Sequence, residues 1–202
     1  MISPIYIVLF SIELLMPPAA MARYAGNQNA PVDEYKSQVS ILGLTLGRNT
    51  LTEVRAKLGA AAVKEHGHTA TWRRRICYVS ANGDGTQLTF ESNVIGGGVY
   101  LTGFAISQAG DLVNVNSSCR PSLSVTRGLR NEGGIGLGLS KTQVLALLGQ
   151  PEETNGSLLT FKSAFKERSR TRAEIYDVLT FIQIVVRNSQ TVSVRVSRTE
   201  TN

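Results

Sequence analysis

Hydrophobic and polar positions fall into helical spacing in residues 134–151. Three apolar residues recur there at the spacing of one helical face: Val144, Leu147 and Leu148. Ser140 with Gln143 three residues later is typical of a capping box at a helix start. Gly149 followed by Pro151 is typical of a helix end. The pattern therefore predicts a short capped helix that must pack against other elements to be stable.

A similar stretch lies about 90 residues earlier, at residues 43–59. Thr50 and Glu53 form a second candidate capping box, and Gly59 ends the stretch. Its apolar stripe consists of Leu51, Val54 and Leu58. Because caps, stripe and terminators agree together, the comparison favours a tandem repeat, with a chance match as the alternative.

After each predicted helix the apolar period changes to that of strands separated by turn residues. The predicted strands cover residues 70–80, 86–91, 99–107 and 112–115, and then 158–162, 174–187 and 191–198. We therefore predict an α+β fold of two tandem units, at residues 39–118 and 134–202. Each unit has a short helix (or helix pair) packed on an antiparallel sheet of about four strands, and residues 119–133 link them.

The N-terminus carries an apolar run that Glu13 interrupts and that Ala-Met-Ala follows at residues 20–22. This pattern predicts a secretory signal peptide over residues 1–22 and a flexible lead over residues 23–38. No Lys or Arg precedes the run, so a misplaced start codon or a weak anchor is the alternative. The run is too short for a transmembrane helix, and we expect a periplasmic or secreted protein that does not span a membrane.

The chain has only two cysteines, Cys77 and Cys119. In an exported protein an even number of cysteines favours a disulfide bond, here closing a loop of about 43 residues. The alternative is two reduced thiols buried separately. Neither cysteine directly follows the apolar run, so the sequence offers no lipoprotein attachment site.

The chain is basic, with a formal net charge of +6, and its cations are clustered. Arg73, Arg74 and Arg75 directly follow Trp72, and on a strand Arg74 faces away from the other two. A second cluster consists of Lys162, Lys166, Arg168, Arg170 and Arg172. If the two sheets align, the clusters form one surface for acidic proteins, lipid headgroups or cell-wall polymers. The alternative is a solvated face, and we do not expect a nucleic-acid partner.

Aromatic side chains are the other candidates for a contact face, because they are favoured interface anchors. They are Trp72, Tyr78, Phe90, Tyr100 and Phe104. We expect Phe90 and Phe104 in the core, and Trp72 and Tyr100 at the surface. The predicted binding residues are Trp72, Arg73, Arg74, Arg75, Tyr78 and Tyr100.

Catalytic chemistry has little support in the sequence. His66 and His68 are the only histidines, so a Ser/His/Asp triad has few candidate bases. Together with Glu65 they could ligate zinc or copper, but a polar loop between helix and strand explains them more simply. We therefore predict that the protein is not an enzyme and has no cofactor, with metal binding as a weaker alternative.

Residues 135–149, Ile-Gly-Leu-Gly-Leu-Ser-Lys-Thr-Gln-Val-Leu-Ala-Leu-Leu-Gly, resemble the opening segment of the β-lactamase inhibitory protein fold. The same pattern occurs in the related BamE, SmpA and OmlA-like outer-membrane proteins. In the inhibitory protein, two helix-plus-sheet units line up their sheets into a concave, aromatic-rich face that grips a partner protein. The BamE-like members are single-unit lipoproteins of the outer-membrane assembly machinery.

The resemblance implies a non-catalytic, secreted or periplasmic module that binds a protein partner. The alternative is a structural envelope factor related to the outer-membrane assembly proteins, although this chain lacks their lipidated cysteine. The contact residues of the inhibitory protein have no assignable counterparts here, so the sequence identifies neither a β-lactamase target nor another partner.

Overall fold

The computed structural model describes residues 37–94, 97–108, 119–168 and 175–201, which belong to one compact unit, Pro31–Asn202. The α-helices are α1 (Leu51–Leu58) and α2 (Lys141–Leu148), and Thr69–Thr71 forms a 3₁₀ turn. The strands of the first half are β1 (Ser40–Ile41), β2 (Leu44–Thr45), β3 (Val63–His66), β4 (Arg73–Ser80), β5 (Thr86–Asn93), β6 (Gly103–Gln108) and β7 (Arg120–Ser122). Those of the second half are β8 (Glu153–Asn155), β9 (Leu158–Arg168), β10 (Ile175–Arg187) and β11 (Gln190–Thr201).

Both predicted helices are present, and each begins at the predicted cap. The hydroxyl of Ser140 accepts a hydrogen bond from the N–H of Gln143 at 3.2 Å, and the Gln143 side chain accepts one from the N–H of Ser140 at 2.8 Å. Thr50 and Glu53 make the corresponding capping box at α1. One detail of the predicted α2 stripe is wrong, because Leu147 is 40% exposed. Val144 and Leu148 point into the core, and one step of 100° per residue turns Leu147 away from it.

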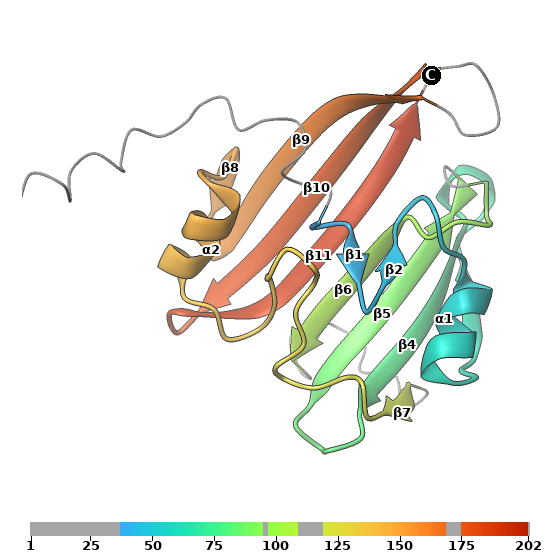
Figure 1. Cartoon of the computed structure of the whole chain (residues 1–202), viewed down its shortest axis with the longest axis horizontal. Coiled ribbons are helices and arrows are strands. Elements are labelled where there is room, and N and C mark those ends of the chain that lie inside the picture. Colours follow the sequence, from blue (N-terminus) through green and yellow to red (C-terminus); the bar gives the residue numbers. More distant parts are fainter. Residues whose placement is uncertain (1–36, 95–96, 109–118, 169–174, 202) are drawn as a thin grey trace, which may run out of the picture. The chain divides into compact units, whose positions relative to one another are not determined.

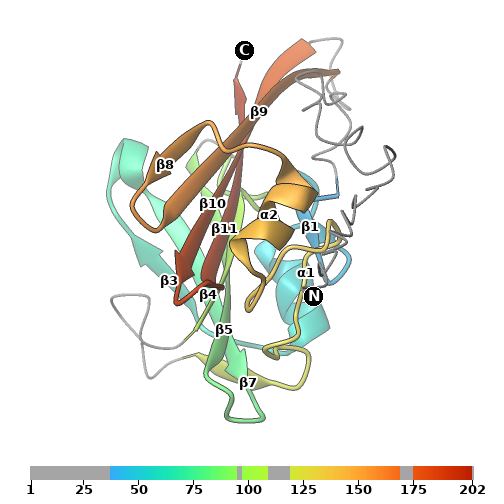
Figure 2. The same cartoon turned by 90° about the vertical axis from the view of Figure 1, so that its left-hand side faces the viewer.

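Strands β3 to β11 form one large sheet rather than two small ones, and β1 and β2 form a separate hairpin. Its order is β3-β4-β5-β6-β11-β10-β9-β8 (Figure 1; β3 is labelled in Figure 2). Strand β7 lies parallel to β4, and all other pairs are antiparallel. The two halves meet where β6 pairs with β11, from Ser107 opposite Ser193 to Gly103 opposite Ser197. Among the residues that the structure describes, 51% lie in strands and 14% in helices.

The predicted fold class is therefore wrong: the chain does not form two tandem units with separate sheets of about four strands. Two separate sheets would each end in an unpaired strand at β6 and at β11. Unpaired strand edges leave backbone donors and acceptors without partners, and pairing β6 with β11 satisfies them. The sheet is consequently continuous across the middle of the chain.

One face of this sheet carries the core, together with both helices and the β1–β2 hairpin (Figure 2). Val54 of α1 and Val144 of α2 belong to the same buried apolar cluster as Phe104 of β6 and Val196 of β11. Side chains at alternate strand positions point to the opposite face, which we call the open face.

The segment between the halves, predicted as a linker at residues 119–133, packs on the core. Val125 and Leu129 are buried there. The buried amide of Asn131 donates to the carbonyl of Gln38 at 2.9 Å, and its oxygen accepts from the N–H of Ile135 at 2.7 Å. This segment thus closes over the end of the β1–β2 hairpin.

Several predictions concern residues outside the described ranges. They are the signal peptide at residues 1–22, nearly all of the lead at residues 23–38, and the short strand at residues 112–115. Among the helices that the structure does describe, none is long and apolar enough to cross a membrane.

Candidate functional site

The open face contains a hollow with a volume of about 500 Å³, which reaches from β3 at one side of the sheet to β9 at the other. Its charged and imidazole side chains are Lys64, His66, Arg73, Arg75, Glu91 and Arg195. Uncharged residues, among them Thr89, Ala105, Gln183 and Ser193, form the rest of the lining. We take this hollow as the candidate site.

Small side chains in the middle of the sheet create the depth of the hollow. On the open face, β6 contributes only Gly103, Ala105 and Ser107, because its large residues Phe104 and Ile106 point into the core. A Cβ added to Gly103 would lie 3.2 Å from the carbonyl oxygen of Val196. The small residues of β6 therefore form the floor of the hollow, and longer side chains on the flanking strands form its sides.

Two arginines share one carboxylate across this floor. Arg75 of β4 donates from Nε to Glu91 Oε1 of β5 at 2.9 Å, and its Nη2 donates to the same oxygen. Arg195 of β11 donates from Nη2 to Glu91 Oε2 at 2.9 Å. Arg195 reaches over β6 to do so, which the lack of a side chain at Gly103 permits.

This Arg75–Glu91–Arg195 cluster fixes the positions of two cations at the centre of the site. The Glu91 side chain is only 15% exposed, whereas those of Arg75 and Arg195 are 40% and 46% exposed. Each guanidinium has five N–H donors and spends only one or two of them on Glu91. The arginines therefore keep donors that face the solvent in the hollow.

Lys64 and Arg73 add further positive charge at the β3–β4 side. Neither makes an ion pair with any residue in the described part of the chain. Among the described residues that line the hollow, four cationic side chains thus face a single carboxylate. A surface recess lined mainly by one sign of charge concentrates its potential, here favouring anionic groups.

The predicted arginine arrangement agrees with the structure. Arg73 and Arg75 line the hollow, whereas Arg74 points to the opposite face of β4. There Arg74 Nε lies 3.3 Å from Glu65 Oε1, an ion pair without hydrogen-bond geometry. Arg74 is therefore not part of the candidate site.

The predicted aromatic contacts do not line the hollow. Trp72 is half-buried, with its ring against the backbone of Gly98, and Tyr100 is 47% exposed beside Thr50 at the start of α1. Neither ring belongs to the lining of the hollow. The rings of Phe90 and Phe104 are buried, as predicted, with centroids 6.4 Å apart.

Tyr78 requires a correction, since the structure places this predicted binding residue in the core. Its side chain is fully buried, and its hydroxyl donates to the carbonyl of Gly59 at 2.8 Å. Burial raises the pKa of the Tyr78 hydroxyl, although the charges of Arg55 and Arg120 oppose the shift. Position 78 shares the face of Ile76 and not that of Arg75, so it supports the fold rather than a contact surface.

The second basic cluster lies on the open face as far as it is described. Lys162 of β9 pairs with Phe181 of β10, with its ammonium 5.8 Å from the ring centroid. Lys166 lies 3.3 Å from the carboxylate of Asp177. The backbone of Arg168 closes β9, whereas Arg170 and Arg172 lie outside the described residues.

The predicted disulfide between Cys77 and Cys119 is present, with the two Cα atoms 4.7 Å apart. Both half-cystines line the hollow. The bond holds the start of β7 beside β4, where Arg120 pairs with Tyr78 in parallel register. One wall of the site is thus covalently fixed.

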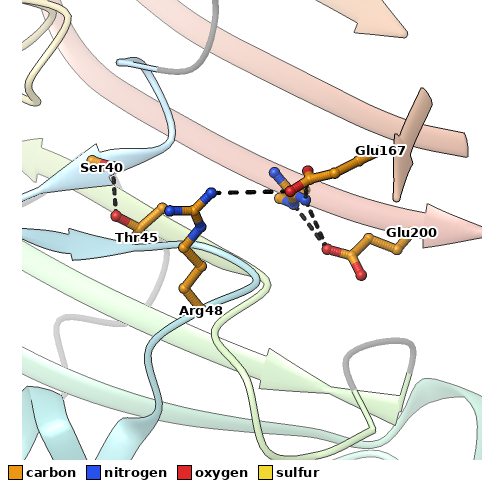
Figure 3. A network of polar contacts seen from close by, with 6 residues as sticks. Ser40, Thr45, Arg48, Glu167 and Glu200 are labelled. Carbon is orange, nitrogen blue, oxygen red and sulfur yellow. Dashed lines mark hydrogen bonds and ion pairs between the residues drawn. The ribbon is translucent and has the colours of Figure 1, made fainter. Parts of the chain in front are cut away.

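A separate ionic network lies on the face that carries the core (Figure 3). Arg198, whose side chain is only 10% exposed, donates to Glu167 at 2.6 Å and to Glu200 at 2.9 Å. Arg48, in the loop before α1, approaches Glu167 to 4.0 Å. These pairs join that loop to β9 and β11, so we assign the network a structural role.

Metal binding gains no support from the described residues, which contain no group of three metal-ligating side chains. His66 faces the hollow, whereas Glu65 points to the other side of β3 toward Arg74. His68 precedes the 3₁₀ turn and accepts with its carbonyl from Thr71. The three predicted candidate ligands are therefore divided between two faces of β3 and a turn.

Sequence reasoning missed Lys64, Glu91 and Arg195 as site residues. The small alternate residues of β6 are the local signal that could have identified a recess on that face. No family model, curated protein or solved structure matches this chain in the comparisons made.

Proposed function

We propose that this protein is a non-catalytic binding protein that holds a partner protein in the hollow of its open face. The observation that supports the proposal is the hollow itself, because its cationic side chains all project from one continuous sheet. Arg75 and Arg195 are held by Glu91, and the Cys77–Cys119 disulfide fixes the adjoining wall. A site prepared in this way loses little side-chain freedom when a partner binds.

We also propose that the protein works in the periplasm or is secreted. The disulfide supports this location, because such bonds persist in oxidising compartments. The predicted signal peptide at residues 1–22 supports it independently. The predicted envelope-factor role would place the same protein in this compartment.

A bulky residue in the floor of the hollow tests the binding function. Ala105→Trp fills the space beside Arg195, its cross-strand partner, whereas Leu123→Trp adds the same ring at a position that is 77% exposed. Each purified variant is first checked for native far-UV circular dichroism. Tagged proteins then capture partners from an envelope extract, and each retained protein is purified and titrated calorimetrically.

We expect a partner that binds the wild type and Leu123→Trp with the same affinity and binds Ala105→Trp at least tenfold more weakly. A retained partner that binds all three proteins equally would contradict a role for the hollow. The absence of any partner whose affinity responds to Ala105→Trp would overturn the proposal.

A further inference from the structure

We infer that an extended acidic polypeptide segment of the partner binds in the hollow and continues across the open face to β9, and that its carboxylates pair with the cations of this face. This inference rests on the proposed function and specifies its ligand. Three observations support it: the charged residues along one row across the sheet, the N–H donors of the arginines that Glu91 does not use, and the small side chains between the charged residues.

The cross-strand register aligns one residue from each of seven neighbouring strands. In order from β3 to β9 this row is Lys64, Arg75, Glu91, Gly103, Ser197, Phe181 and Lys162. Six strand spacings of about 4.8 Å give a row of roughly 29 Å. An extended chain that rises about 3.3 Å per residue covers this length with about nine residues.

The cations of the row stand toward its two ends. Lys64 and Arg75 occupy the β3–β4 end. Arg73 lies beside this end, two residues before Arg75 on β4 and on the same face. Lys162 occupies the β9 end, beyond the lining of the hollow, with its ammonium over the ring of Phe181. A ligand that crosses the sheet therefore meets positive charge at both of its ends.

Glu91 positions the two arginines and does not repel an acidic ligand. Because Arg75 and Arg195 both donate to it, its charge is already shared by two cations. The remaining guanidinium donors match carboxylate oxygens in geometry and make charge-assisted hydrogen bonds. Between the charged ends, Arg195 reaches over β6 to Glu91, and the small side chain of Ser197 leaves room for the backbone of the ligand.

Direct titration with a defined acidic peptide tests the inference. The probe is a fluorescein-labelled peptide of twelve glutamates, and a peptide of twelve glutamines with the same label is the control. Fluorescence anisotropy is measured in low-salt buffer. We expect saturable binding of the glutamate peptide alone, weakened by added salt because the contacts are exposed.

Adjacent arginines provide matched variants. Arg73→Ser removes a cation of the hollow, and Arg74→Ser removes one from the opposite face of the same strand. We expect Arg73→Ser and Lys64→Ser each to weaken binding about three- to fivefold, and Arg74→Ser by less than twofold. Equal losses for Arg73→Ser and Arg74→Ser would overturn the inference, since unlocalised charge would then explain binding.

A second ligand class is included to separate the sources of negative charge. The second probe is a vesicle that contains 30% phosphatidylglycerol. If the vesicles bind in an Arg73-dependent manner and the glutamate peptide does not bind, the ligand is a lipid headgroup and the inference is overturned. If Ala105→Trp abolishes capture of a partner but the glutamate peptide does not bind wild type, the proposed function stands and the acidic ligand is wrong. Peptide binding that depends on Arg73 and not on Arg74 supports the inference.

Discussion

Glu91 is the residue on which the arrangement of the open face depends. It lies on the interior strand β5 and binds Arg75 from one side and Arg195, 104 residues away in sequence, from the other. Without a carboxylate at this position, the two guanidinium groups would lose their shared acceptor and repel each other. The same side chain thus contributes to stability and sets the geometry of the site.

Replacement of Glu91 by Gln should therefore lower the free energy of unfolding. Charge-assisted hydrogen bonds contribute up to about 3 kcal/mol when buried, but both arginines are two-fifths or more exposed, so we expect about 1 kcal/mol. Urea unfolding at pH 7 measures the change. The control is Arg73→Ser, which removes a cation that makes no ion pair within the described part of the chain and should change the value by less than about 0.5 kcal/mol.

Asp84 links acid stability to the turn between β4 and β5. Burial opposes the ionisation of Asp84, but hydrogen bonds from the backbone N–H groups of Thr86 and Arg127 outweigh it and hold its pKa below the ordinary value. A lowered pKa in the folded protein stabilises it above the unfolded-state pKa of about 3.9, and this stabilisation is lost as the pH falls through the lowered value.

Asp84→Asn should therefore lower the melting temperature at pH 7, and the difference from the wild type should shrink between pH 4 and pH 2. Thermal unfolding followed by circular dichroism at pH 7, 4 and 2 tests this. Glu153→Gln, at an exposed position of β8, serves as the control carboxylate substitution. A difference for Asp84→Asn that stays constant over this range would contradict the assigned role of the charge.

Among the elements, the helices and turns were predictable because their signals are local. The capping residues of α1 and α2 lie within three residues of the groups they bind, and Gly59 and Gly149 end the helices with φ of +95° and +76°. The turn of residues 82–85 between β4 and β5 was predicted for the same reason. Spacing alone did not reveal that Leu147 is exposed, because that depends on which sheet surface the helix meets.

The cap of α2 offers a direct test at this scale. Ser140→Ala removes the acceptor for the N–H of Gln143, and we expect the free energy of unfolding to fall by about 1 kcal/mol. Lys141→Ala, at the next and exposed position, keeps the cap and should leave stability nearly unchanged. Chemical denaturation of both variants measures the difference, and equal effects would show that the cap is not the cause.

The disulfide between β4 and the start of β7 should stabilise the folded protein. It joins residues separated by 42 positions, and replacing both cysteines by serine should lower the free energy of unfolding by about 2–4 kcal/mol. Melting temperatures with and without dithiothreitol provide the measurement. Reductant should destabilise the wild type and leave Cys77→Ser/Cys119→Ser unaffected, whereas a wild type insensitive to full reduction would contradict this prediction.

The joining of the two halves is the feature of the whole molecule that the sequence did not reveal. Hydrophobic alternation predicts that residues 99–107 and 191–198 are strands, but it contains no information on which strand each one pairs with. The pairing of Gly103 with Ser197 bridges 94 positions. The candidate site was predictable only in part for the same reason, since Arg73 and Arg75 are local to one strand while Glu91 and Arg195 reach them through the sheet.

One continuous sheet with one core should unfold as one cooperative unit. Trp72, the only tryptophan in the chain, lies directly before β4 and reports on the first half, whereas amide hydrogen exchange in β10 reports on the second. We expect Trp72 fluorescence, far-UV circular dichroism and β10 protection to lose their native values at the same urea concentration.

A variant in the second half makes this prediction decisive. Val196 of β11 is fully buried opposite Phe104 of β6, and Val196→Ala should lower the free energy of unfolding by about 2 kcal/mol. Because the halves share a core, Trp72 fluorescence should report this loss in full, although the substitution lies in the other half. Val99→Ala, at a position that is 55% exposed, should leave the midpoint within error. A Trp72 transition unmoved by Val196→Ala, with only the β10 amides destabilised, would mean that the halves unfold independently despite their shared sheet.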